Sequence, residues 1–481
     1  MKIKHIMIQG TSSNVGKSII TAGICRMLAN KGYKVAPFKA QNMALNSGVT
    51  FDGLEMGRAQ ILQAEACKIL PDVRMNPILL KPTGGGKSQV IRLGKPYKIV
   101  SYKDYYKMYE ENLKIVKEAF YSLSEEFDII VLEGAGSPAE INLQKFDIVN
   151  MKMAEIANAK IYIVGDIDRG GVFAAFKGTY DLIQPQYKKL VKGFIINKFR
   201  GDLSLLKPGI DEFKNFCDIP IIGVIPYFEH NLEDEDSQNL FTKKNIKSGE
   251  KLLNIGIIKL PHISNFTDFQ PLENIEKINV SYVTKLENLE NNDFIIIPGS
   301  KNTVSDMDYL LKNGFYEQLK NLYGKKWIMG ICGGFQMLGK KIIDSLGVEN
   351  KGDIEGFGFI DMITEMEEEK ILKRGEYLPA NGFLNNSIQG YEIHHGNTII
   401  NDRDVIDILE NKGLLVFNKK NRIIGTYLHG IFENSEFLQF IFKLFDKQVV
   451  INKTYNELKE ETLNKLADLI ENCIFGDLIN D

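Results

Sequence analysis

The chain has 481 residues, more than one ordinary hydrophobic core holds, so we expect two or three domains. Hydrophobic residues make up 44% and charged residues 25%, and the formal net charge of −3 gives no reason to expect nucleic acid or an acidic membrane surface as a partner. The sequence has no signal-peptide pattern and no apolar stretch that could span a bilayer, which predicts a cytoplasmic protein. Five cysteines without paired spacing indicate neither disulfides nor a zinc site.

Short apolar runs alternate with helical patterns in the first half of the chain. Runs of this kind, separated by helices, predict a parallel sheet covered on both faces. Ligands in such α/β sheets bind beyond the carboxyl ends of the strands, so the residues that follow each run are candidate site residues. The predicted strands are residues 5–8, 34–38, 129–132, 161–164, 194–197 and 221–225.

A glycine-rich loop follows the first predicted strand and precedes a helix. Its backbone N–H groups can surround phosphates, Lys17 offers a positive charge, and the Ser18 hydroxyl can bind Mg²⁺. Five residues separate Gly10 from Gly16, one more than usual, and this spacing resembles the dethiobiotin-synthetase-like branch of phosphate-loop (P-loop) enzymes, which activate carboxylates. A plain glycine-rich turn with a solvated lysine is the alternative. The predicted ATP-binding residues are Gly10, Thr11, Ser12, Ser13, Asn14, Val15, Gly16, Lys17 and Ser18.

Acidic residues follow two later predicted strands. Glu133 stands where the run 129–132 meets a glycine turn, and Asp166 and Asp168 follow the next strand in the same way. Because the ends of parallel strands share one edge of the sheet, Glu133 is a candidate Mg²⁺ ligand together with Ser18. Either aspartate could bind metal or orient substrate. Carboxylates that only cap helices or turns remain the alternative.

The second half repeats the alternation after an acidic and polar stretch, residues 229–251, which predicts a linker. Apolar runs at residues 255–260, 294–297, 327–331 and 423–427 predict a second α/β unit. Residues 330–336, with the sequence GICGGFQ, read as strand, tight turn and helix with Cys332 at the corner. This pattern is typical of a nucleophile elbow, in which a helix N-terminus favours the thiolate.

Cys332 needs groups that stabilise an oxyanion and a base that takes a proton. Backbone N–H groups of Gly333 and of Gly299, which follows the run 294–297, are suited to the oxyanion. His429, at the end of a predicted strand, is the best candidate for the base, and the pair at 394–395 is the competitor. A lone histidine is more often a packed or surface residue, so the residues alone leave the base open.

The elbow resembles that of class I glutamine amidotransferases. The resemblance implies that Cys332 attacks the glutamine carboxamide, that Gln336 helps to hold the glutamine, and that His429 is the base. Those enzymes usually carry a glutamate two residues after the histidine, where this chain has Ile431. The missing acid resembles the cobyrinate and cobyric acid branch, which works with cysteine and histidine alone. Glu433 and Glu392 are possible substitutes.

Motifs along almost the whole chain, through about residue 445, are similar in order to the cobyric acid branch of that family. They lie at residues 9–11, 39–43, 55–60, 81–83, 133–140, 166–171 and 390–394. The resemblance implies use of ATP, Mg²⁺ and glutamine to amidate the b, d, e and g carboxylates of adenosylcobyrinic acid a,c-diamide in vitamin B12 biosynthesis. It implies small-molecule substrates and neither a nucleic-acid partner, a membrane nor a tightly bound cofactor.

The same resemblance divides the chain into four parts. These are an ATP-dependent amide-synthetase domain at 1–230, a linker at 231–251, a glutamine amidotransferase domain at 252–445 and a helical C-terminal tail at 446–481. Three alternatives remain. The first is the a,c-diamide branch of the family, which residues 55–60 and 133–140 disfavour. The second is a P-loop switch ATPase of the partitioning type, which leaves Cys332 unexplained, and the third is an inactive scaffold, which the presence of Cys332 and His429 disfavours.

Overall fold

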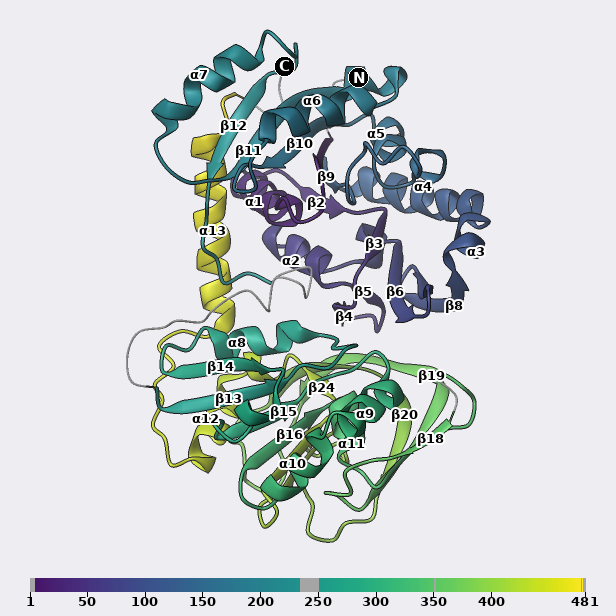
Figure 1. Ribbon diagram of the computed structural model, residues 1–481, viewed down its shortest axis with the longest axis vertical. Coiled ribbons are helices and arrows are strands. Elements are labelled where there is room, and N and C mark those ends of the chain that lie inside the picture. The colour runs from purple at the N-terminus through teal and green to yellow at the C-terminus, as the bar shows by residue number, and fades with distance from the viewer. Residues whose placement is uncertain (1–4, 234–250, 350–351, 477, 479–481) are drawn as a thin grey trace. The chain divides into compact units, whose positions relative to one another are not determined.

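The protein is described here by a computed structural model, in which residues 5–233, 251–349, 352–476 and 478 are described (Figure 1). The chain forms two compact units. Unit 1 contains Met1–Ala44, Met56–Glu235 and Lys459–Asp481, and unit 2 contains Leu45–Glu55 and Asp236–Leu458. Most of the predicted linker, 231–251, lies outside the described residues.

Unit 1 is built on a six-stranded parallel sheet with the strand order β12-β11-β10-β1-β9-β2. Each of the six strands predicted in the first half corresponds to one of these, which confirms the predicted parallel α/β sheet. The phosphate loop and Glu133 lie at the carboxyl ends of neighbouring strands. The strands are β1 (Ile6–Gly10), β2 (Val35–Phe38), β9 (Ile129–Glu133), β10 (Lys160–Asp166), β11 (Val191–Phe199) and β12 (Ile221–Pro226).

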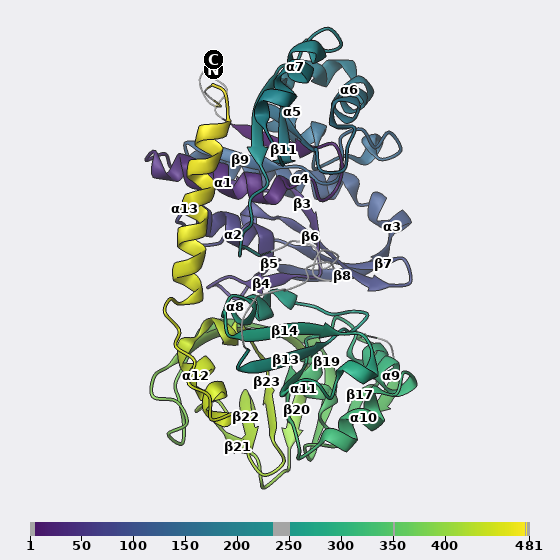
Figure 2. The ribbon, with the colours of Figure 1, turned by 60° about the vertical axis from the view of Figure 1, so that its left-hand side comes forward.

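Helices cover both faces of this sheet, because alternate residues of its buried strands point to opposite sides. Figure 2 places α1 and α13 on one side and α6 and α7 on the other. Ile6 and Ile8 of β1 belong to the core cluster that contains α1 and α13 residues, whereas Met7 between them does not. The helices are α1 (Lys17–Asn30), α2 (Arg58–Ala66), α3 (Tyr102–Tyr106), α4 (Tyr109–Glu126), α5 (Met151–Ala157), α6 (Val172–Leu182), α7 (Leu203–Phe213) and α13 (Tyr455–Cys473).

Two segments belong to a different unit of the structure from the one that the predicted domain boundaries would give them. Helix α13, within the predicted tail 446–481, buries Leu466 and Ile470 in the core of unit 1, because its apolar residues recur at helical spacing on one face. An added Cβ on Gly23 of α1 would lie 2.3 Å from the Cδ1 of Ile470, so the two helices pack closely. The other segment is Leu45–Glu55, which packs in unit 2.

Unit 1 also contains a four-stranded sheet that the sequence patterns did not predict, in the order β3-β6-β7-β8. Its strands β7 and β8 form an antiparallel hairpin. The strand β8 is exposed along most of its length and so lacks the apolar run that marks a buried strand. The strands are β3 (Gln41–Met43), β6 (Ile78–Gly84), β7 (Lys87–Arg92) and β8 (Lys95–Ser101).

Unit 2 is built on a seven-stranded sheet with the order β14-β13-β15-β16-β23-β22-β21, parallel from β14 to β23 and antiparallel beyond. The four strands predicted in the second half are all present. The strands are β13 (Leu253–Ile258), β14 (Ile278–Val283), β15 (Phe294–Ile297), β16 (Trp327–Ile331), β21 (Ile406–Asp407), β22 (Leu415–Asn418) and β23 (Ile423–Thr426). The helices of this unit are α8 (Gln270–Glu273), α9 (Thr303–Lys312), α10 (Phe315–Leu322), α11 (Gly333–Met337) and α12 (Ser435–Leu444).

A five-stranded sheet, not predicted from the sequence, completes unit 2 in the order β18-β17-β19-β20-β24. Its long hairpin of β19 (Met362–Tyr377) and β20 (Ile388–Ile400) places β20 beside β24 (Leu428–His429). The other strands are β17 (Lys341–Asp344) and β18 (Gly352–Glu355), and a short pair joins β4 (Ser47–Val49) to β5 (Glu55–Gly57). No helix among the residues described is both long enough and apolar enough to cross a membrane.

Candidate functional sites

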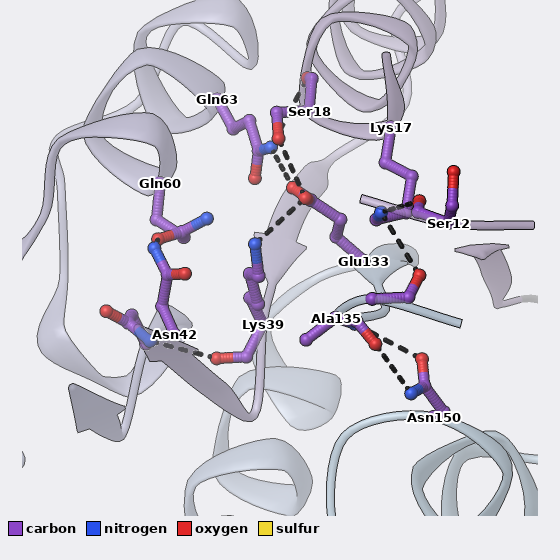
Figure 3. A network of polar contacts seen from close by, with 12 residues as sticks. Ser12, Lys17, Ser18, Lys39, Asn42, Gln60, Gln63, Glu133, Ala135 and Asn150 are labelled. Atoms are coloured by element: carbon purple, nitrogen blue, oxygen red, sulfur yellow. Dashed lines mark hydrogen bonds and ion pairs between the residues drawn. The ribbon is translucent and has the colours of Figure 1, made fainter. Parts of the chain in front are cut away.

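The phosphate loop connects β1 to α1 through backbone conformations that favour glycine. Gly16, the residue before α1, has φ +98°, and an added Cβ on Gly10 would lie 2.7 Å from the Cγ2 of Val15. Lys17 donates from Nζ to the carbonyl oxygens of Ser12 (2.9 Å) and Gly136 (3.2 Å), so its charge lies across the mouth of the loop (Figure 3). This arrangement can hold an anion against backbone N–H groups and a lysine.

Glu133, the last residue of β9, is the centre of a buried polar network (Figure 3). Its Oε1 accepts hydrogen bonds from Ser18 Oγ at 2.8 Å and Lys39 Nζ at 3.0 Å, and its Oε2 accepts one from Gln63 Nε2 at 2.6 Å. Only 1% of Glu133 is exposed, and Lys39, which is 3% exposed, balances its charge. The predicted pair of Ser18 and Glu133 is therefore in direct contact.

Hydroxyl and carboxylate oxygens are donors that suit Mg²⁺, which usually keeps waters and nucleotide phosphates as its other ligands. The donor set of Ser18 and Glu133 fits such an ion. Within residues 5–233, 251–349 and 352–476, no group of three or more His, Cys, Asp or Glu side chains is arranged to hold a metal. A metal here would therefore depend on the nucleotide for further ligands.

The two aspartates predicted near this edge are paired with cations. Asp166 accepts a hydrogen bond from Lys198 Nζ at 2.8 Å, and the same amine donates to the carbonyl of Asn14 in the phosphate loop, also at 2.8 Å. Asp168 lies 3.4 Å from Arg200 Nε, where both side chains are exposed. Asp166 therefore supports the loop through Lys198, which is a simpler role than metal binding.

Cys332 occupies a strained turn between β16 and α11. Its φ of +51° and ψ of −109° are unusual for a residue with a side chain. An added Cβ on Gly330 would lie 2.5 Å from the Gly334 carbonyl oxygen, and one on Gly334 would lie 2.1 Å from the Ile297 carbonyl oxygen. Only glycine fits at both positions, which explains why glycines surround the cysteine. The geometry is that of the predicted nucleophile elbow.

The two predicted oxyanion donors lie beside the elbow. An added Cβ on Gly333 would lie 3.1 Å from the backbone nitrogen of Ser300, and one on Gly299 would lie 3.3 Å from the Cε1 of His429. The turn at Gly299 and Ser300 is thus adjacent both to the residue after Cys332 and to the histidine ring. The role of their backbone N–H groups in stabilising an oxyanion stays a prediction.

His429 forms a buried pair with an aspartate that the sequence analysis did not consider. Its Nδ1 lies 2.6 Å from Asp268 Oδ2, and Asp268 Oδ1 accepts a hydrogen bond from the Gly430 N–H at 2.9 Å. Burial alone would lower the pKa of His429, but the charge and hydrogen bond of Asp268, together with a hydrogen bond to Cys332, raise that pKa to about 10.

The competing histidines of β20 have other partners. The His394 ring stacks on Tyr427, with centroids 3.9 Å apart. His395 Nδ1 lies 3.0 Å from the carbonyl oxygen of Glu367, and burial, followed by the positive charges of Lys301 and Lys370, lowers the pKa of His395 to about 3. Of the three histidines, His429 is the one whose ring lies next to the turn at Gly299, where an added Cβ would be 3.3 Å from its Cε1.

Gln336, predicted to help hold glutamine, lies on α11 one turn after Cys332. Its Nε2 donates to the carbonyl of His395 at 2.8 Å, and its Oε1 accepts from Thr303 Oγ1 at 3.3 Å. The Thr303 N–H also donates to Glu349 at 2.5 Å, and burial raises the pKa of Glu349 to about 7. The amide is therefore fixed between β20 and the start of α9, at the edge of the cysteine site.

Asp268 is the carboxylate that contacts the His429 ring, the role for which the sequence offered Glu433 and Glu392 as possible substitutes. Glu392 instead accepts a hydrogen bond from Tyr377 OH at 3.1 Å and lies 3.6 Å from His394. Asp268 is on the 3₁₀ helix Phe266–Phe269, 161 residues before His429 in the sequence. No local spacing connects residues so far apart, so no sequence signal could have suggested the pair.

Comparison with known proteins also finds a nucleotide-binding domain in the first half of the chain and a glutamine amidotransferase domain in the second. Residues 6–241 match the family model of the CobQ/CobB/MinD/ParA nucleotide binding domain, and residues 254–437 match that of the CobB/CobQ-like glutamine amidotransferase domain. The fold and the two matched regions define the class: an ATP-dependent, glutamine-hydrolysing amide ligase. The ATP-binding and amidotransferase domains predicted from the sequence are confirmed at this level.

Curated relatives define the family more closely. The chain is 46% identical to a cobyric acid synthase of Clostridium novyi, 47% to one of Ruminiclostridium cellulolyticum and 45% to one of Clostridium acetobutylicum. Each alignment covers 98% of this chain and between 95% and 97% of the relative. The chain belongs to the cobyric acid synthase family.

Proposed function

We propose that this enzyme amidates the b, d, e and g carboxylates of adenosylcobyrinic acid a,c-diamide, with ATP to activate each carboxylate and glutamine to supply the nitrogen. The observation that carries the proposal is the presence in one chain of an ordered phosphate loop next to Glu133 and of a strained Cys332 next to His429. Either site alone would serve many functions, whereas the two together serve ammonia transfer to an activated acid.

Glutamine hydrolysis begins with the Cys332 thiolate, which forms a bond to the side-chain carboxamide carbon. The N–H groups of Gly299 and Gly333 stabilise the resulting oxyanion. His429 then gives its proton to the departing nitrogen, so that ammonia leaves and a glutamyl thioester remains. Water hydrolyses the thioester to glutamate and restores the thiolate. Asp268 keeps the imidazole oriented through its 2.6 Å contact with Nδ1.

Carboxylate activation takes place at the phosphate loop. A carboxylate resists ammonia because oxide would have to leave, whereas an acyl phosphate releases inorganic phosphate. A carboxylate oxygen of the substrate forms a bond to the γ-phosphorus of ATP and ADP departs, with Lys17 offsetting charge on the phosphates. Ser18 and Glu133 would hold a Mg²⁺ ion, which supplies further positive charge to the phosphates. Ammonia then displaces phosphate and gives the amide.

Mass spectrometry tests the proposal directly. Adenosylcobyrinic acid a,c-diamide incubated with the enzyme, MgATP and glutamine should lose one carboxyl OH and gain one NH₂ at each of four positions. Cobyrinic acid without the a and c amides is the control substrate, and it should be a poor acceptor. Amidation of that control at the a and c carboxylates, with none on the diamide, would assign the chain to the a,c-diamide reaction instead.

The pair of His429 and Asp268 leads to a prediction about pH. The pKa of His429 is raised to about 10 from an ordinary value of about 6.5, so the protonated ring should persist until the pH rises through about 10. Asp268→Asn removes the charge that raises this pKa. We expect kcat/KM for glutamine hydrolysis to fall by roughly 10²- to 10⁴-fold and its alkaline limb to move to lower pH.

Two matched variants control this measurement. Glu392→Gln and Glu433→Gln make the same carboxylate-to-amide change near the site, and neither should move the alkaline limb. A wild-type limb in Asp268→Asn combined with a shifted limb in Glu392→Gln would show that the wrong carboxylate has been assigned to His429.

A further inference from the structure

The turn between β15 and α9 is held against α9 by a buried carboxylate. Asp306, in the first turn of α9, is 0% exposed, and its Oδ2 accepts a hydrogen bond from Ser300 Oγ at 2.6 Å. The Ser300 hydroxyl also accepts the Asn302 N–H at 3.0 Å. Ser300, itself buried, thus uses its hydroxyl as donor and acceptor at once, which ties the turn to the helix.

A histidine contacts the other oxygen of the same carboxylate. His262 Nδ1 lies 2.8 Å from Asp306 Oδ1, and the backbone nitrogen of His262 lies 3.3 Å from each carboxylate oxygen. The hydrogen bond to Asp306 raises the pKa of His262, and burial, which alone would lower that pKa, is the smaller effect. Burying a carboxylate costs free energy unless donors satisfy it. Ser300 and His262 supply these donors, so the three side chains form one network.

Asp306 is not needed to cap its own helix. Asn302 caps α9, because its Oδ1 accepts the Ser305 N–H at 3.1 Å. The hydrogen bonds of Asp306 go instead to Ser300, which precedes the helix, and to His262, which follows β13. The carboxylate therefore serves the turn rather than the helix.

Backbone hydrogen bonds also join the turn to the segment that follows β13. The Ser264 N–H donates to the Gly299 carbonyl and the Lys301 N–H donates to the His262 carbonyl, both at 2.9 Å. These bonds lie on either side of Ser300 and do not involve its side chain. Variants that lose the side-chain network should therefore still fold, with the turn displaced by a small distance.

Ser300 and its neighbour Gly299 border the cysteine site. An added Cβ on Gly333, the residue after Cys332, would lie 3.1 Å from the backbone nitrogen of Ser300 and 3.2 Å from its Cβ. The N–H groups of Gly299 and Gly333 are the predicted oxyanion donors. The network of Asp306 therefore sets the separation between the two turns that carry these donors.

We propose that Asp306, acting through the Ser300 hydroxyl, is a positioning residue for glutamine hydrolysis, because it fixes the turn of Gly299 against that of Gly333. The proposal rests on the proposed function for the role of these turns in stabilising the oxyanion. The oxyanion exists in the transition state and not in bound glutamine, so a displaced turn should lower kcat and leave KM nearly unchanged. A misplacement of about 1 Å can cost roughly 100-fold in rate, so loss of the network should cost roughly 10- to 100-fold.

Ser300→Ala tests the proposal, since it removes the hydroxyl and keeps the backbone of the turn. We expect kcat for glutamate release from glutamine to fall by roughly 10- to 100-fold, with KM for glutamine within about twofold of the wild-type value. Ser300→Thr keeps a hydroxyl and should recover most of the lost rate. Asp306→Asn has one acceptor oxygen in place of two and should also lower kcat at a nearly unchanged KM. Because both residues act at one contact, the double variant should be no slower than the slower single variant.

Two controls separate positioning from folding. Ser281→Ala removes another hydroxyl of unit 2, one that donates to Asn292 Oδ1 at 3.3 Å, and should hydrolyse glutamine at the wild-type rate. Labelling of Cys332 by an electrophilic glutamine analogue counts the intact sites, and each kcat is divided by that count. A loss that disappears after this division is a folding effect and overturns the proposal.

Three further results would each overturn it: an unchanged kcat in Ser300→Ala, a Ser300→Thr variant as slow as Ser300→Ala, or fully additive losses in the double variant. Failure of the proposed function looks different, because the wild-type enzyme would then form no corrinoid amide from glutamine or ammonia, whatever the hydrolysis rates of the variants.

Discussion

Cys332→Ser should abolish amidation that uses glutamine and leave amidation that uses added ammonia. The variant loses the thiolate that attacks glutamine, while the phosphate loop that activates the carboxylate is unchanged. We expect the glutamine-dependent rate to fall by on the order of 10⁴-fold or more, as happens when a nucleophile is removed. The measurement is corrinoid amide formation with glutamine at neutral pH and with ammonium salts at alkaline pH, where free ammonia is abundant.

A matched control distinguishes chemistry from folding. Cys217→Ser makes the same change of one atom at another buried cysteine, 7% exposed, in unit 1, and should leave both activities near those of the wild type. Loss of the ammonia-dependent activity in Cys332→Ser would point to misfolding. Retention of the glutamine-dependent activity would mean that Cys332 is not the nucleophile.

The features predicted from the sequence are those with a local cause. The phosphate loop needs glycines at Gly10 and Gly16 because of close contacts and a positive φ, and the cysteine turn needs Gly330 and Gly334 for the same kind of reason. Such constraints can be recognised in the sequence because they require glycine at positions only a few residues apart. The six strands of the sheet in unit 1 and four of the seven in the large sheet of unit 2 were predicted for an equivalent reason, since continuous burial selects continuous apolar runs. The buried strand β22 was not predicted.

The features that were missed depend on contacts between distant residues. Nothing near Asp268 in the sequence indicates that it pairs with His429, because the two residues are 161 positions apart and meet only in the folded unit. The segment Leu45–Glu55, which packs in unit 2, was predicted as part of the synthetase half, since its neighbours in the sequence belong there. The hairpin of β19 and β20 is mostly exposed along β19 and so lacks an apolar run. The roles assigned to the site residues stay predictions until the variants are measured.

Lys17→Ala should eliminate amidation with both nitrogen sources, glutamine and ammonia. Lys17 lies across the phosphate loop, and its removal withdraws a positive charge from a transition state in which negative charge spreads over the transferring phosphoryl oxygens. Loss of one such group typically costs roughly 10²- to 10³-fold in rate. Steady-state formation of corrinoid amide and of ADP should fall together.

A control variant and a labelling experiment complete the test of Lys17→Ala. Lys31→Ala removes a lysine that directly follows α1 and makes an exposed ion pair with Glu471, so it should leave the activity near that of the wild type. Cys332 in Lys17→Ala should still be labelled by an electrophilic glutamine analogue, because its own site is intact. The two variants therefore fail at different steps: Cys332→Ser is rescued by ammonia and Lys17→Ala is not. If Lys17→Ala used ammonia at the wild-type rate, the phosphate loop would not be the site of carboxylate activation, and the coupled reaction proposed for this chain would have to be abandoned.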